Sequence, residues 1–80
     1  MRRRWFRARN AAGLARAVQD VRRASGLTQD ELAAAIGSSR PTLSRLERGG
    51  ATSTDTVLAA LTRCGYEIVV VPRGSTVTVS

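Results

Sequence analysis

Near the middle of the sequence, start and stop signals for short helices alternate at a spacing that constrains the fold more than any other feature. Thr28 and Glu31 form the T-x-x-E pattern of a capping box, in which each residue bonds the backbone N–H of the other. Gly37 ends this helix after about two turns, because glycine is the residue most often found just past a helix end. Residues 38–41, Ser-Ser-Arg-Pro, start a second short helix, which Gly49–Gly50 ends. The pattern predicts two short helices joined by a tight turn.

The second of these helices has an apolar and a polar side. Leu43 and Leu46 are spaced to face inward. The outer side carries a hydroxyl and two guanidinium groups: Thr42, Arg45 and Arg48. Because a proline ring disfavours the α region for the residue before it, Arg40 is a candidate for the cap position, alongside the two serines before it.

A longer helix precedes this pair and another helix follows it. Asn10 is a suitable N-cap for the first, and Gly26 ends it. Its apolar positions recur at spacings of three and four: Leu14, Ala17, Val18, Val21 and Ala24. Its polar side carries Arg16, Asp20, Arg22 and Arg23. The last helix begins at Ser53 or Thr54 and ends at Gly65, with its apolar positions at Val57, Leu58 and Leu61.

After this mainly all-α domain of residues 11–65, the sequence changes to β-branched residues. Residues 66–71 predict one strand without a partner in the chain, with its apolar residues at Ile68, Val69, Val70 and Val71. An unpaired strand edge favours pairing with a second copy, and an antiparallel ribbon across a twofold axis would make a homodimer. Residues 72–80 are a C-terminal tail or, after a turn at 72–75, a second strand over 76–79 that completes an intrachain hairpin.

Residues 1–10 form a basic arm with five arginines and no acid, and so carry +5 of the net charge of +7. Such a run is either a solvated tail or an extension that contacts phosphates. Trp5 and Phe6 suit docking on the domain or on a partner. All thirteen cations of the chain are arginine, which favours bidentate contacts to phosphate or guanine but also follows from genome base composition.

Composition excludes most catalytic and metal chemistry. A chain of 80 residues is at most one small domain, and this one has no histidine and one cysteine. Histidine-based triads, histidine metal sites and an internal disulfide are therefore excluded, and Cys64 is expected to be a small buried hydrophobe. Asp30 and Glu31 are adjacent on a helix, so their carboxylates diverge. We expect neither an enzyme nor a bound cofactor or metal, and a cytoplasmic protein without a membrane segment.

Two short helices, the second exposing hydroxyl and guanidinium groups, are an arrangement that reads DNA in the major groove. Arg40 and Arg45 suit bidentate contacts to guanine, and Pro41 suits a thymine methyl. Gln29 suits a phosphate at the start of its helix. The remaining candidates are hydroxyl and cationic ligands for phosphates or base edges: Ser39, Thr42, Ser44 and Arg48.

Several of these candidates have a simpler interpretation. Ser39 suits a role as a cap alone, and Arg45 suits pairing with Glu47 or another acid on a solvated face. Arg48 is either a phosphate contact or a neutraliser of its neighbours. Glu31 and Glu47 are interpreted as structural, because they repel phosphate unless they are paired internally.

The segments LTQDELA at 27–33, IG at 36–37 and SRPTLSRLERG at 39–49 resemble the Cro/repressor type of helix-turn-helix, the xenobiotic-response-element family, over residues 14–64. More narrowly, LARAV at 14–18 and TDTVL at 54–58 resemble the HipB-type antitoxins. The resemblance implies a lambda-repressor-like domain of four to five helices and a homodimer that shares a β-ribbon. It also implies an inverted-repeat operator and a HipA-type serine/threonine kinase toxin as partner. The resemblance gives the recognition roles to Ser39, Arg40, Pro41, Ser44 and Arg45, with Gln29 on a phosphate.

This sequence departs from the family pattern at the arginine-rich arm and at Pro41.

The sequence leaves three functions to compare. The first is a dimeric DNA-binding regulator, with or without a toxin partner; the second is a toxin-binding interaction module with little DNA readout; the third is a small enzyme. The absence of histidine, paired cysteines and a phosphate-binding glycine loop argues against the third.

Overall fold

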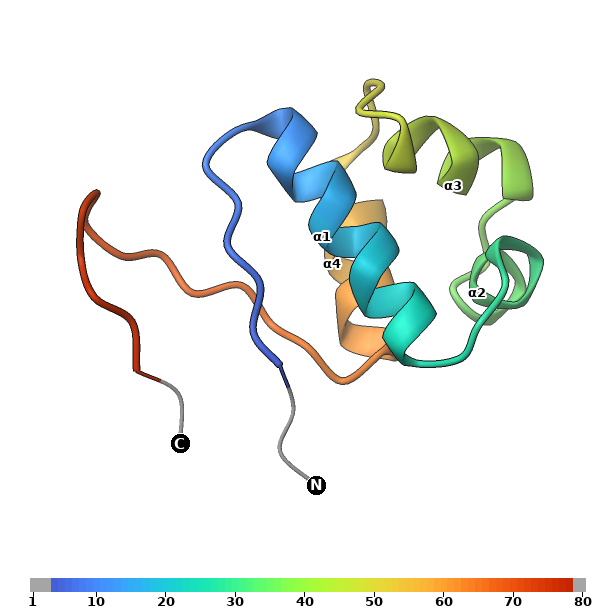
Figure 1. Cartoon of the computed structure of the whole chain (residues 1–80). Helices are drawn as coiled ribbons and strands as arrows, with labels where there is room; N and C mark the ends of the chain where they lie inside the picture. Colours follow the sequence, from blue (N-terminus) through green and yellow to red (C-terminus); the bar gives the residue numbers. More distant parts are fainter. Residues whose placement is uncertain (1–3, 79–80) are drawn as a thin grey trace.

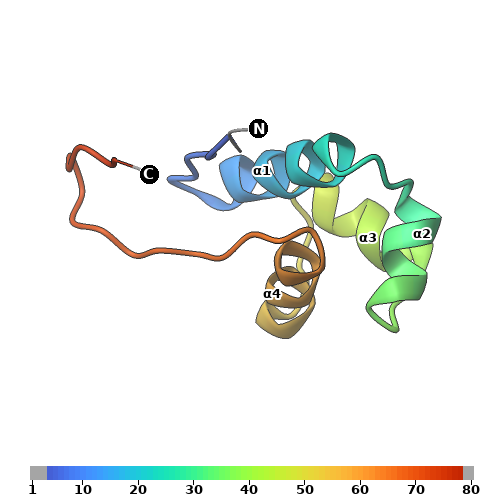
Figure 2. The same cartoon turned by 90° about the horizontal axis from the view of Figure 1, so that it is seen from below.

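The computed structural model describes residues 4–78, and within them the chain forms helices and no strand. The helices are α1 (Ala11–Ala24), α2 (Gln29–Ala35), α3 (Arg40–Glu47) and α4 (Thr54–Arg63). α1 packs on α4, and α2 and α3 lie together on one side of that pair (Figure 1; Figure 2). The all-α class predicted for the body of the chain is confirmed.

The helices begin at the polar residues that the sequence indicates. Asn10 caps α1 through a 2.7 Å hydrogen bond to its side-chain oxygen, and Ser53 caps α4. Of the candidates for the cap of α3, Ser39 holds the position and Arg40 is the first helical residue. The reason is chemical: the serine hydroxyl accepts the N–H of Thr42 at 3.3 Å, whereas a guanidinium has donors only.

The core lies where the four helices meet. Its largest fully buried side chains are Val18 of α1, Leu32 of α2 and Leu43 of α3. The buried cluster comprises Val18, Val21, Leu32, Ala33, Leu43, Leu46, Val57, Ala60, Leu61 and Cys64. Cys64 is 8% exposed, which confirms the expectation of a small buried hydrophobe. Each helix thus contributes to a single core, and this core fixes α3 relative to the rest of the molecule.

Three positions differ from the helical pattern. Leu58, which the pattern assigns to the core, is 41% exposed, and Ala24 is exposed at the last turn of α1. In α4 the inward face is formed by positions 57, 60 and 61 and continues to the C-cap Cys64, and Leu58 lies just outside this face. Arg22, which the pattern assigns to the polar side of α1, is buried. Periodicity therefore located the faces to within about one residue.

The chain after Gly65 runs extended and forms no β-ladder within the described residues, so the single chain has no strand at 66–71. The turn predicted at 72–75 is present, with the Ser75 N–H bonding the Pro72 carbonyl at 3.1 Å. Residues 76–78 do not pair back, so the intrachain hairpin is wrong for the part that is described, while residues 79–80 lie outside it. Residues 67–71 have no neighbouring strand within the described chain, which accounts for their extended backbone without a β-ladder.

Candidate nucleic-acid interface

α2 and α3 are connected by a turn that hydrogen bonds define on both sides. Thr28 and Glu31 form the reciprocal capping box at the start of α2, at 2.9 and 3.1 Å, and these bonds lower the pKa of Glu31. At the end of α2, Gly37 adopts a φ of 67°, in the left-handed region that favours glycine. The Ser38 N–H can then bond the Ala33 carbonyl at 2.8 Å. Local hydrogen bonds therefore define where α2 begins and how the turn after it is formed.

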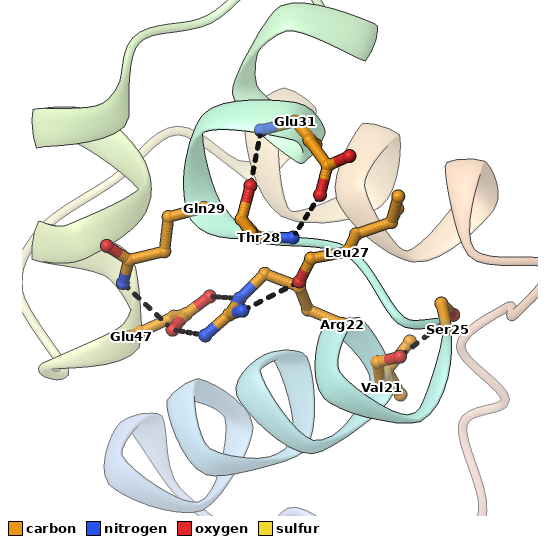
Figure 3. Close-up of polar contacts among 8 residues, drawn as sticks. All are labelled: Val21, Arg22, Ser25, Leu27, Thr28, Gln29, Glu31 and Glu47. Atoms are coloured by element: carbon orange, nitrogen blue, oxygen red, sulfur yellow. Dashed lines mark hydrogen bonds and ion pairs between the residues drawn. The ribbon is translucent and has the colours of Figure 1, made fainter.

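A buried ion pair, which we call the clamp, ties α3 to α1 (Figure 3). Arg22 donates from Nε and Nη2 to the two carboxylate oxygens of Glu47, at 2.6 and 2.9 Å. Its Nη1 donates to the carbonyl of Leu27 at 2.8 Å, and the side-chain amide of Gln29 donates to Glu47 at 3.1 Å. The side chains of Arg22 and Glu47 are 10% and 2% exposed. One set of contacts thus joins α1, the loop after it, α2 and α3.

The clamp keeps both of its charged groups ionised. Burial alone would raise the pKa of Glu47, but the hydrogen bonds from Arg22 and Gln29 and the charge of Arg22 outweigh it, and the pKa is lowered. The hydrogen bond to Glu47 raises the pKa of Arg22 in turn. Bidentate pairing with additional hydrogen bonds is the arrangement in which a buried ion pair is tolerated. Glu47 is therefore structural, as predicted, and its negative charge is neutralised internally.

The exposed side of α3 borders a shallow hollow, which we call the arginine hollow. It is lined by Gln29, Arg40, Pro41, Ser44, Arg45 and Arg48. The nearest acid to Arg40 is Asp30, whose Oδ2 lies 4.0 Å from Arg40 Nη1. Both side chains are largely exposed, at 65% and 71%, so this pair contributes little stability and leaves Arg40 available to an anion. The hollow is cationic.

The structure divides the predicted site residues into two groups. The six residues of the arginine hollow are brought together, with Ser44 accepting a 2.8 Å hydrogen bond from Nη1 of Arg48. Ser39 and Thr42 lie at the cap instead, where their hydroxyl oxygens are 2.9 Å apart. Glu47 pairs with Arg22, so the interpretation of Arg45 as its partner is wrong. Gln29 directs one amide hydrogen to Glu47, which holds its side chain beside the hollow.

Arg22 is the residue of this region that sequence reasoning did not identify. The one available signal was Glu47. This acid lies on an arginine-rich helix, and it needs an internal partner if the surface of that helix is to accept phosphate. The sequence does not say which of thirteen arginines supplies that partner, because Arg22 and Glu47 are 25 residues apart.

A second concave surface lies between the arm and the C-terminal segment, on the side of α1 and α4 away from α3 (Figure 1). Phe6 packs on the core, with its ring centroid 6.0 Å from that of Tyr66, so this aromatic residue of the arm docks on the domain. Trp5 remains 47% exposed. The residues predicted to form a dimer are exposed in the single chain: Ile68, Val69, Val70 and Val71. Residues 1–3 of the arm lie outside the described part of the chain.

Residues 4–78 contain neither a metal-binding cluster nor a membrane-spanning helix. No three metal-ligating side chains lie close enough together to hold an ion. None of the helices there has the length and apolar character needed to cross a membrane.

Comparison with known proteins agrees with this geometry. A helix-turn-helix family profile, HTH_3, matches residues 18–71. In the solved structure of a HipA-HipB-O2-O3 complex, HipB superposes with a TM-score of 0.76 and 27% sequence identity, over 86% of this chain and 99% of HipB. No curated protein matches the sequence. The chain belongs to the Cro/C1-type helix-turn-helix family and has the fold of HipB.

Proposed function

We propose that this protein is a sequence-specific regulator of transcription that inserts α3 into the major groove of double-stranded DNA. The observation that carries the proposal is the arginine hollow, a cationic surface along the second helix of a helix-turn-helix. Arg40 and Arg45 are assigned to guanine edges and Pro41 to a thymine methyl. A bidentate arginine–guanine contact supplies about 1–3 kcal/mol of discrimination.

The other residues of the site are assigned to positioning on the DNA backbone. Gln29 and Arg48 suit phosphates because their side chains donate hydrogen bonds and line the same hollow as the proposed base-reading residues. The assignment of Ser39, Thr42 and Ser44 is to phosphates or base edges through their hydroxyls. Phosphate contacts set the register, and base contacts set the sequence.

The binding unit is proposed to be a homodimer on an inverted-repeat operator. Ile68–Val71 are four consecutive exposed apolar residues in an extended segment, which suits antiparallel pairing with the same segment of a second copy. A twofold dimer of this kind places its two α3 helices on half-sites about 34–36 Å apart, one turn of DNA.

The narrower proposal is that the protein is the autorepressing antitoxin of a type II toxin–antitoxin module and neutralises a HipA-type serine/threonine kinase. Its support is the likeness to HipB in a complex that also contains HipA. On this proposal the protein is not itself an enzyme. Two alternatives differ in their partners: a phage-repressor-like regulator without a toxin, and a toxin-binding module with little DNA readout.

The test of DNA reading is the selection of bound duplexes from a random pool at about 0.15 M salt, a concentration at which nonspecific phosphate binding is weakened. Wild type is compared with the Arg40→Ala, Arg45→Ala double variant. We expect wild type to enrich an inverted repeat that the double variant does not select. A folded wild-type protein that enriches no sequence would contradict the proposal and favour the toxin-binding module.

The antitoxin proposal is tested separately, by titrating the purified protein into a HipA-type kinase and following both complex formation and autophosphorylation. We expect a stable complex and inhibition by wild type, retained in the Arg40→Ala, Arg45→Ala variant. DNA selection without any complex would identify the regulator that lacks a toxin.

A further inference from the structure

The loop after α3 lies against one of the proposed base-reading side chains. A Cβ atom at Gly50 would lie 2.5 Å from Cγ of Arg45 and 3.0 Å from its carbonyl oxygen. Non-bonded carbon atoms attract best at about 3.5–4.0 Å, so 2.5 Å is a steric clash. We infer that Gly50 is a positioning residue for Arg45: the missing side chain leaves the space that the Arg45 stem occupies while Arg45 lines the arginine hollow. The inference rests on the proposed function, in which Arg45 reads a base.

The backbone conformation of Gly50 does not by itself require glycine at this position. α3 ends in a Schellman motif, with the Gly49 N–H bonding the Leu46 carbonyl at 3.0 Å and the Gly50 N–H bonding the Arg45 carbonyl at 2.8 Å. Gly49 holds the left-handed position of that motif, with a φ of 83°, whereas Gly50 does not have a positive φ. In Schellman motifs, the side chain of the residue after the left-handed position often contacts the third residue from the end of the helix. In α3 that residue is Arg45.

The most severe obstruction to a side chain at Gly50 is therefore the Arg45 stem at 2.5 Å, and the contact with the Arg45 carbonyl oxygen at 3.0 Å is tight but less severe. Side chains occupy a few staggered rotamers, so an obstructed stem moves to another well and does not shift by a small amount. A methyl group at Gly50 would move the Arg45 guanidinium to a different part of the surface. The expected consequence is a loss of base preference at the position that Arg45 reads, with phosphate contacts retained.

The two adjacent glycines provide a matched pair of variants. Gly50→Ala introduces the clash with Arg45, whereas a Cβ at Gly49 meets nothing within 4 Å and only strains a backbone with positive φ. Gly49→Ala thus disturbs the same turn without obstructing Arg45. Kd is measured for the duplex that wild type selects and for a random duplex, using Gly50→Ala, Gly49→Ala, Arg45→Ala and the Arg45→Ala, Gly50→Ala double variant.

We expect Gly50→Ala and Arg45→Ala each to weaken binding to the selected duplex by about tenfold, within the range of one bidentate contact. The double variant should bind no more weakly than Arg45→Ala alone, because the two changes remove the same contact. Selection with Gly50→Ala should show relaxed preference at the same base pair as selection with Arg45→Ala. Two results would overturn the inference. One is a double variant in which the affinity losses of the single variants multiply; the other is a loss of base preference in Gly49→Ala equal to that in Gly50→Ala.

Thermal unfolding followed by circular dichroism tests the contact without DNA. Gly50→Ala should lower the Tm of wild type more than it lowers the Tm of Arg45→Ala, in which the obstructing Cγ is gone. Equal reductions in both backgrounds would show that Gly50 does not act through Arg45. If wild type enriches no duplex, the proposed function is overturned, and with it the base-reading part of this inference. The Tm comparison would still show whether Gly50 acts through the Arg45 side chain.

Discussion

At the scale of single residues, Glu47 shows how an acid is accommodated on a helix that is proposed to approach phosphates. Its carboxylate points inward and receives hydrogen bonds from Arg22 and Gln29, so its side chain is 2% exposed. A buried ion pair of this kind adds little net stability by itself, but the loss of one member is costly because the other charge is left without a partner. The clamp therefore fixes the position of α3 more than it stabilises the fold as a whole.

Removal of the clamp carboxylate gives the first prediction. Glu47→Ala leaves Arg22 buried with its bond to the Leu27 carbonyl as the one retained clamp contact, and we expect the free energy of unfolding to fall by about 3 kcal/mol. Urea denaturation at neutral pH measures this change. A loss below about 0.5 kcal/mol, typical of a surface substitution, would show that the ion pair is not held as described.

The pH dependence of stability follows from the same carboxylate. The folded pKa of Glu47 is lowered, so its contribution to stability is complete above the unfolded value, about 4.3, and is lost as the pH falls through the folded pKa. Urea denaturation repeated between neutral and acidic pH should show stability declining on the acid side. In Glu47→Gln this decline should be shallower, with a remainder from Glu31, whose pKa is also lowered. An unchanged acid decline in Glu47→Gln would contradict the assignment.

At the scale of helices, start and stop positions were predictable, whereas the identity of some buried residues was not. Caps such as Thr28 and Ser39 act within three residues, so the sequence contains the whole interaction. The burial of Arg22 and the exposure of Leu58 depend on contacts between helices that are distant in the sequence. Within the site, residue types identified the exposed side of α3, but the clamp beneath it required the tertiary structure.

The cap of α3 provides a prediction that separates stability from DNA binding. Ser39→Ala should cost about 1 kcal/mol, because the Thr42 N–H loses its acceptor. Ser39→Asp retains a good cap and should match wild type within about 0.5 kcal/mol. If Ser39 lies beside phosphates, the new negative charge should weaken DNA binding by about tenfold. Chemical denaturation and fluorescence anisotropy with the selected duplex provide the two readouts. Unchanged DNA affinity in Ser39→Asp would limit Ser39 to capping.

At the scale of the whole molecule, two surfaces lie on different sides of the α1–α4 pair. The arginine hollow borders α3, while the arm and the C-terminal segment lie together on the other side (Figure 2). The proposed dimer contacts are thus kept apart from the proposed DNA contacts within each chain. The sequence predicted a strand at 66–71, and the single chain is extended there without a β-ladder. The proposed pairing would need a second chain, which the fold of one copy does not contain.

Dimer formation through this segment is tested with a single charge. Val70 is 92% exposed in the single chain, so Val70→Asp should leave the fold of each copy intact and prevent pairing of the two strands. Light scattering after size exclusion should report a dimer for wild type and a monomer for Val70→Asp. Thr76→Asp, also at an exposed position beyond the turn, serves as the control and should remain dimeric. A dimeric Val70→Asp variant would place the dimer contacts elsewhere.

The clamp has a consequence for redesign of this protein. Because Glu47 is held by Arg22 on α1, which also donates to the carbonyl of Leu27, residues 28–48 are not a self-contained cassette that can be moved into another scaffold with its geometry preserved. A graft has to include α1 from Arg22 onward, or supply a guanidinium at an equivalent position. Outward side chains of α3, in contrast, can be exchanged one at a time without disturbing this support. On the proposed function, new operator preferences are therefore more accessible by point substitution than by helix exchange.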